Sequence, residues 1–142
     1  MLWPVKTYNI IYADPPWTYY VWTSKDKGRT ASAHYETMST ENICALPVAN
    51  ITASDCILFL WTTCPNLPDA LMVVNSWGFT YKTVAFVWVK TNRDGSPFMG
   101  LGHWSRANAE LCLLATKGKP KRVNRAVNQI VFAPKREHSR KP

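Results

Sequence analysis

"YNIIYADPPWTYY", residues 8–20, is the stretch on which the interpretation of this chain depends. Its first half, Tyr8–Ala13, is apolar and aromatic, a composition typical of a buried strand. The strand then meets an acid, two prolines and a tryptophan, Asp14–Trp17, and neither proline has an N–H to donate to a neighbouring strand. The stretch therefore predicts a strand that ends in a rigid corner carrying one carboxylate.

The rest of the chain shows helical and strand patterns that alternate at first. Ser39 is a suitable N-cap, because its hydroxyl can accept a hydrogen bond from an early N–H of a helix. A second helix has Pro68 near its first position and ends at Gly78, as helices commonly do. "CILFLW" at 56–61 is continuously apolar, which predicts a strand buried on both faces. The expected helices cover 39–46 and 67–78, and the expected strands cover 8–13, 56–61, 81–90, 109–116 and 128–134.

This order of elements favours an α/β fold in which helices cover a sheet. The length of 142 residues suits one domain, residues 1–142. Ligands of α/β sheets bind at the carboxyl ends of strands. Two notable stretches fall at such ends, the Asp14–Trp17 corner and Trp61–Thr63 after the second strand. We therefore expect a functional site at this edge of the sheet.

Positive charge is concentrated near the end of the sequence. The formal net charge is +8, from 17 Lys and Arg against 9 Asp and Glu. Nine of these basic residues and one acid, Glu137, lie between Lys117 and Lys141, which leaves eight of each sign in the first 116 residues. A basic excess of this kind favours a polyanionic partner such as nucleic acid. A solvated basic surface without a partner is the alternative.

Cysteine spacing and hydropathy exclude several protein classes. Cys44, Cys56, Cys64 and Cys112 show no C-x-x-C spacing, so we expect reduced thiols and no metal site. No secretory signal pattern precedes the first strand, and no apolar run reaches 18 residues. These patterns favour a cytoplasmic protein without a membrane segment.

The acid–proline corner suits one kind of chemistry. The exocyclic amine of a nucleobase is a poor nucleophile, because its lone pair is delocalised into the ring. Two acceptors, one for each N–H, favour a localised lone pair on that nitrogen. Asp14 can supply a carboxylate, and Pro15 can supply a carbonyl that its own fixed φ and the following Pro16 hold in place. Trp17 can stack on the base, typically for ~1–3 kcal/mol. An ordinary Asp-Pro turn is the structural alternative.

Six blocks follow one another along the chain: "YNIIYADPPW", "HYETMSTENICALPV", "CILFLWTT", "WGFTYKTVAFVWVKTN", "GLGHWSRANAELCLLATKGKP" and "APKREHSRKP". In this order they resemble the DPPW-type adenine N6-methyltransferases. That family includes the catalytic subunit of the mRNA adenosine methyltransferase and many bacterial and phage DNA methyltransferases, and the likeness is greatest to the compact bacterial and phage members. The resemblance implies a Rossmann-like class I methyltransferase sheet flanked by helices, with S-adenosylmethionine as cofactor.

The resemblance also implies roles for individual residues. Asp14 and Pro15 would receive the adenine amino group beside the cofactor, while Pro16 and Trp17 would complete the corner and wall the base pocket. Glu110 opens an apolar strand, where an unpaired charge is costly, so we expect it to face the site. The other implied residues are His34, Tyr35 and Trp104 for the substrate, and Lys141, with Asp14 and Pro15, for the cofactor. A loop histidine at His34 and a solvated basic tail around Lys141 are the structural alternatives.

The chain departs from the family pattern at its end. In the relatives, the block that ends in HSRKP leads into a helix and a strand that form much of the cofactor pocket, whereas this chain stops at Pro142. The expected fold is therefore C-terminally incomplete, a fragment or a chain completed by a homo-oligomer or a partner chain. We expect weak binding of S-adenosylmethionine, loose packing of residues past about Ala133, and an open cleft beside Asp14.

The predicted activity is metal-independent transfer of a methyl group from S-adenosylmethionine to N6 of adenine, in DNA rather than RNA. This would take place in the cytoplasm of a bacterial or phage-infected cell. The alternative is a non-catalytic or partner-dependent nucleic-acid-binding pseudo-methyltransferase, which the missing C-terminal block favours. Methylation of a cytosine amine or a protein glutamine is a third hypothesis, and the flanking blocks argue against it.

Overall fold

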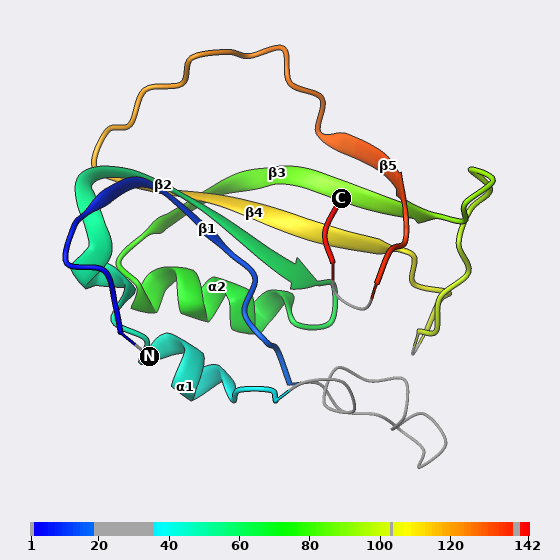
Figure 1. Ribbon diagram of the computed structural model, residues 1–142, viewed down its shortest axis with the longest axis horizontal. Coiled ribbons are helices and arrows are strands. Elements are labelled where there is room, and N and C mark those ends of the chain that lie inside the picture. The colour runs from blue at the N-terminus through cyan, green and yellow to red at the C-terminus, as the bar shows by residue number, and fades with distance from the viewer. Residues whose placement is uncertain (1, 19–35, 103, 138–139) are drawn as a thin grey trace.

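The computed structural model describes residues 2–18, 36–102, 104–137 and 140–142. Within these ranges, five strands form one sheet that packs with two α-helices (Figure 1). The strands are β1 (Tyr8–Ala13), β2 (Thr52–Thr63), β3 (Thr80–Thr91), β4 (Ala109–Lys117) and β5 (Ile130–Pro134). The helices are α1 (Thr40–Cys44), α2 (Leu67–Ser76) and a short 3-10 helix, Val48–Ile51. The α/β class and every expected helix and strand are confirmed, with ends that differ by a few residues.

One edge of the sheet collects the ends of all five strands. The strand order is β1-β2-β4-β3-β5. β1 runs parallel to β2 and β3 parallel to β5, while β4 is antiparallel to both β2 and β3. The carboxyl ends of the four parallel strands therefore meet the amino end of β4. This arrangement places the corner after β1 close to the start of β4.

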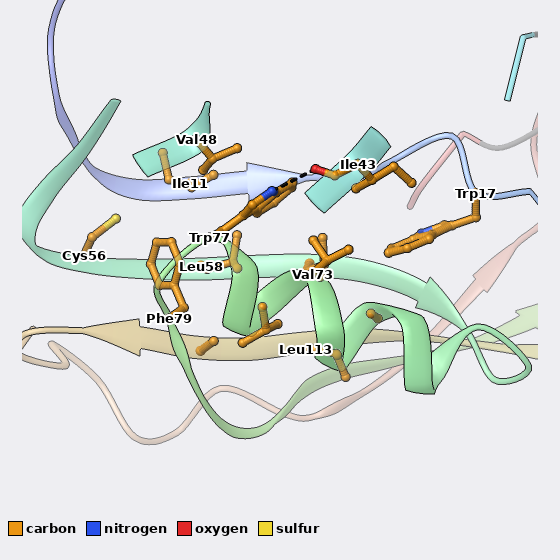
Figure 2. Close-up of a cluster of buried hydrophobic side chains, with 14 residues drawn as sticks. Ile11, Trp17, Ile43, Val48, Cys56, Leu58, Val73, Trp77, Phe79 and Leu113 are labelled. Atoms are coloured by element: carbon orange, nitrogen blue, oxygen red, sulfur yellow. Dashed lines mark hydrogen bonds between the residues drawn. The ribbon is translucent and has the colours of Figure 1, made fainter. Parts of the chain in front are cut away.

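The main hydrophobic core lies between the sheet and the two helices, which pack on the same face of the sheet (Figures 1 and 2). Ser39 caps α1 by accepting a hydrogen bond from the backbone N–H of Asn42 at 3.2 Å, which confirms the predicted N-cap. Trp77, directly after α2, is 3% exposed, and its indole N–H donates to the carbonyl of Ile43 in α1 at 2.9 Å. That bond ties the two helices to each other.

The prediction that β2 is buried on both faces holds only in part. Cys56, Leu58 and Leu60 face the helices and are fully buried. Ile57 and Phe59 alternate with them and remain partly exposed. The described helices cover only the first of these two faces, so a continuous apolar run here marks one core face and one partly covered face.

The second face, which we call the helix-free face, carries a smaller cluster. Trp61, Trp88 and Cys112 are its buried members, and they come from three adjacent strands. Towards β1 the same face is open, because Ile10 and Tyr12 are 59% and 63% exposed.

None of the helices within the described ranges has the length and hydropathy of a membrane-spanning segment.

Gly118, which follows β4, should tolerate substitution poorly, because a left-handed backbone and a close approach of other atoms coincide there. Its φ is +67°, and a Cβ there would collide with the Ser54 carbonyl and with Asp55 Oδ1, which already accepts the N–H of Lys119 at 2.8 Å. Gly118→Ala should therefore destabilise the fold by about 2 kcal/mol or more, since left-handed strain and a backbone clash combine. Urea unfolding measures the loss.

The matched control is Gly95→Ala. Gly95 has a similar φ of +83°, but a Cβ added there would meet no atom within 4 Å, so only the strain of about 1 kcal/mol applies. Equal losses in free energy of unfolding for the two variants would contradict the packing at Gly118.

Candidate functional site

The acid–proline corner is held in one conformation by its own backbone. The carbonyl of Pro15 accepts the N–H of Trp17 at 2.8 Å, which closes a tight three-residue turn. The carbonyl of Pro16 accepts the N–H of Met38 at 2.9 Å. A carbonyl oxygen has two lone pairs, so the Pro15 carbonyl, which directly follows Asp14 in sequence, can accept a second hydrogen bond.

Four charged side chains form a continuous chain of ion pairs at this edge of the sheet. Lys141 Nζ lies 3.0 Å from Asp14 Oδ2 and 3.0 Å from Glu110 Oε2. Lys90 Nζ lies 2.7 Å from the other oxygen of Glu110, Oε1. The side chains of Lys141 and Glu110 are only 11% and 12% exposed, so these contacts are largely shielded from water. We call Asp14, Lys141, Glu110 and Lys90 the charge chain.

Strand register explains why these residues meet. Glu110 is the second residue of β4, and it lies directly opposite Thr63 of β2 and Trp88 of β3. Lys90 comes two residues after Trp88, so its side chain points to the same helix-free face. Glu110 is ion-paired at both of its oxygens, as a charge that opens an apolar strand requires, and its place in a substrate site stays a prediction.

The two carboxyl groups of the charge chain respond differently to burial. Burial raises the pKa of Asp14, and the single neighbouring Lys141 only partly opposes that effect. Burial also acts to raise the pKa of Glu110, but Lys90 and Lys141 together hold it below its ordinary value. Burial acts to lower the pKa of Lys141, yet its two carboxylate partners raise it overall. Lys141 is therefore firmly cationic, and the pKa of Asp14 lies above its ordinary value while the pKa of Glu110 lies below its own.

An aromatic wall completes the surroundings of the Lys141 ammonium. Lys141 Nζ lies 5.6 Å from the ring centroid of Trp61, within the range of a cation–π contact. Trp61 is held in turn by Tyr12, whose hydroxyl accepts its indole N–H at 2.7 Å, and by Trp88, edge-on at 6.5 Å. Two carboxylates and one indole therefore form a site suited to a positive group.

Cys112 lies in the small hydrophobic cluster with Trp61 and Trp88, and its thiol is unreactive. Burial, with a smaller contribution from Asp14, raises the pKa of its thiol to about 12. It therefore stays protonated at neutral pH and is not a nucleophile. All four cysteines are free thiols. Among the described residues, no group of three His, Cys, Asp or Glu side chains is placed to hold a metal ion.

The structure corrects the role expected of Trp17. Its side chain is 5% exposed and belongs to the main core (Figure 2), and its indole N–H donates to the carbonyl of Trp61 at 2.9 Å. Such a ring has almost no surface left to stack on a base. Trp104, by contrast, is fully exposed on a loop. His34 and Tyr35 lie outside the described residues.

The structure also corrects the expectation for the C-terminal segment. Most described residues after Ala133 are exposed, as expected, but Lys141 is held by two carboxylates and does not pack loosely. Its ammonium lies against Asp14, where an open cleft was expected.

Lys90, a member of the charge chain, was not predicted from the sequence. Within "VWVK" this residue was interpreted only as part of a strand. The signal that could have identified it was a charged residue at the end of an apolar strand.

Comparison with known proteins relates the chain to a family of methyltransferases. A family model described as MT-A70 matches residues 8–142. A type II methyltransferase of a Mycoplasma species, M.MunI, is 37% identical over 98% of this chain, which spans 64% of that relative's length. N(6)-adenosine-methyltransferase MT-A70-like proteins of Arabidopsis thaliana and Drosophila melanogaster are 33% and 30% identical, and the chain spans 18% and 21% of their lengths.

Proposed function

Because the chain belongs to the MT-A70 family, we propose that it carries the base-binding part of an adenine-N6 methyltransferase that acts on DNA. The observation that supports this most is the acid–proline corner at the carboxyl edge of an α/β sheet, where Lys141 holds the Asp14 carboxylate and the tight turn to Trp17 holds the carbonyl of the next residue, Pro15. An acid and a carbonyl on one rigid corner are the two acceptors that an exocyclic amine requires.

Asp14 and Pro15 act on the amine of the base. Asp14 Oδ1 and the Pro15 carbonyl each accept one N–H, which leaves the nitrogen lone pair directed away from the corner. The turn closed by Trp17 sets both acceptors before substrate arrives, so little reorganisation is needed during the reaction. The raised pKa of Asp14 also makes its carboxylate a better acceptor for a proton as the amine becomes positively charged.

The residues present suit S-adenosylmethionine, which is itself a cation. The two carboxylates and the Trp61 ring already surround a positive group, the Lys141 ammonium. The same side chains are therefore suited to a cationic group of a ligand. Asp14 would bind a cationic group of the cofactor, and Lys141 its carboxylate. When bound, the cofactor supplies the electrophilic methyl group.

DNA is the proposed substrate because the relative of 37% identity is a bacterial type II methyltransferase. The adenosine named in the plant and insect relatives is a ribonucleoside, which makes RNA the alternative substrate. A bacterial protein of this kind meets both DNA and the cofactor in the cytoplasm. A homo-oligomer or a second chain that completes the cofactor pocket stays a prediction.

A direct assay tests the proposed activity. The chain is incubated with tritiated S-adenosylmethionine at millimolar concentration, so that weak cofactor binding does not limit the rate, and with DNA, RNA or DNA that carries hypoxanthine in place of adenine. We expect label in N6-methyldeoxyadenosine from DNA, none from the hypoxanthine DNA, and less from RNA. Label that survives the loss of the adenine amine, or no label from a folded chain, would overturn the proposal.

A non-catalytic nucleic-acid-binding protein is the second candidate. One observation favours it: the Lys141 ammonium occupies the position beside Asp14 that a cofactor or substrate would need. Binding of DNA without methyl transfer at any cofactor concentration would support this candidate.

The exposed basic segment 117–129 should bind phosphates in either case. Residues 121–129 are all exposed, and the segment runs past the sheet on the side opposite the helices (Figure 1). Changing Lys121, Arg122 and Arg125 to Gln should weaken binding to DNA of any sequence. It should also lower the log–log salt slope by about 2.7, since each lost phosphate contact removes about 0.9.

Salt titrations by fluorescence anisotropy measure this slope. The control has the same net charge but changes three exposed basic residues elsewhere, Lys6, Lys82 and Arg93, to Gln. Equal slopes for the two triple variants would show that the charges on segment 117–129 are only solvated.

A further inference from the structure

Glu110 is the only carboxylate of the charge chain that is paired at both of its oxygens in the described contacts. Oε1 faces Lys90 at 2.7 Å, and Oε2 faces Lys141 at 3.0 Å. A carboxylate paired at both oxygens cannot rotate without breaking an ion pair. The direction in which Glu110 presents Oε2 therefore depends on Lys90.

Lys90 is well suited to act as the fixed end of this arrangement. Its N–H donates to the carbonyl of Asn108 at 2.8 Å, and its carbonyl accepts the N–H of Phe98 at 3.1 Å. Its ammonium lies 5.2 Å from the ring centroid of Trp88, and the side chain is 21% exposed. Both the backbone and the side chain are thus held by neighbours that do not belong to the charge chain.

From this geometry we infer that Lys90 is a positioning residue: it orients Glu110, and Glu110 sets where the Lys141 ammonium meets Asp14. The inference rests on the proposed function for its effect on catalysis, but the contacts themselves do not. With Lys90 present, two ammonium groups balance two carboxylates. Without it, one ammonium would be shared by two carboxylates, and Glu110 would be free to rotate and draw Lys141 away from Asp14.

The plain alternative is a cross-strand ion pair between β3 and β4 that serves only stability. Such a pair would affect the melting temperature but neither the titration of Asp14 nor the kinetics. The groups that face Glu110 are Lys90 on β3, Lys141, and Asp14 beyond it, with Cys112 two residues along β4. Among the described ion pairs, none joins Asp14 to Lys90 directly, so the path between them runs through Glu110 and Lys141.

The experiment uses the whole chain with four variants: Lys90→Met, Lys90→Arg, Glu110→Gln and the double variant Lys90→Met/Glu110→Gln. Lys82→Met is the control, because Lys82 is an exposed lysine at the opposite end of the same strand. Carbon-13 NMR of labelled carboxyl groups follows the titration of Asp14 and Glu110. Methyl transfer gives kcat and KM, and thermal unfolding reports stability.

In Lys90→Met, the titration midpoints of both Glu110 and Asp14 should move to higher pH. The kcat should fall by roughly 100-fold, as when a reacting group is misplaced by about 1 Å, with little change in KM. Lys90→Arg should restore most of both properties, and Lys82→Met should change neither. In the Glu110→Gln background, Lys90→Met should have no further effect on kcat or on Asp14, because Lys90 acts through Glu110.

Two results would overturn the inference. One is an Asp14 midpoint that does not change in Lys90→Met; the other is a changed midpoint with wild-type kcat. If wild type itself transfers no methyl group, the proposed function fails, and the Asp14 titration in the single and double variants still decides whether Lys90 acts through Glu110.

Discussion

Asp14→Ala should abolish methyl transfer and leave the fold nearly intact. The variant removes one of the two acceptors that we propose for the adenine amine, and loss of one such group typically lowers kcat by about 10²- to 10³-fold. Stability should change little, because the Asp14 side chain is 34% exposed and follows a strand instead of filling the core. Lys141 also keeps its second partner, Glu110.

Tritium incorporation into adenine-containing DNA measures the activity, and a thermal melt of the same sample measures the fold. Asp94→Ala is the control, because Asp94 is an exposed loop carboxylate that bonds only to Ser96 among its described contacts. Asp14→Asn adds a second comparison: it keeps the shape of the side chain but replaces one acceptor oxygen with a donor. Wild-type activity in Asp14→Ala would remove this residue from the mechanism.

Trp17→Ala should produce the largest loss of stability of any change in the acid–proline corner. The side chain is 5% exposed within the main core, and truncation of a buried Trp typically costs about 3–5 kcal/mol. The change also leaves the Trp61 carbonyl without its 2.9 Å donor. Since small domains are stable by only about 5–15 kcal/mol in total, the variant should be close to unfolding.

Urea unfolding followed by circular dichroism measures this loss. Trp17→Phe should cost less, about 1–3 kcal/mol, because most of the packing remains and chiefly the hydrogen bond is lost. Trp104→Ala is the matched control, since Trp104 is fully exposed and should change stability by less than about 0.5 kcal/mol. A Trp17→Ala variant as stable as Trp104→Ala would contradict the burial of Trp17.

Local patterns predicted the secondary structure well. β1 was expected at Tyr8–Ala13 and begins and ends there, because apolar composition and the prolines mark both of its limits. The Ser39 cap and the helix after Asn66 were likewise predictable, since caps and Pro–Gly punctuation act within one turn of the chain. The α/β class followed from the order of these elements.

Side-chain environment was harder to predict, because it depends on strands that are distant in sequence. Trp17 belongs to the acid–proline corner in sequence, yet its ring turns into the core, where its indole N–H donates to the carbonyl of Trp61 on another strand. Lys141 was expected to contact the cofactor, with a solvated tail as the alternative, and its two carboxylate partners become apparent only when the folded sheet brings Asp14 and Glu110 to it. Lys90 had no local signal beyond its charge, because its partner is fixed by strand register.

The strand order also has a consequence for how the molecule folds. β3 and β4 are consecutive and antiparallel, so their pairing closes a short loop, whereas β1 reaches β2 only across the segment from Asp14 to Ile51. Loop-closure entropy therefore favours early formation of the β3–β4 pair and late docking of β1. Because Asp14 follows β1 and Lys141 follows β5, the outer strands of the sheet, the charge chain is complete only after both outer strands have docked. The charge chain is therefore assembled late in folding. A partly folded chain, in which β3 and β4 have already paired, has part of the hydrophobic core but not yet the charge chain.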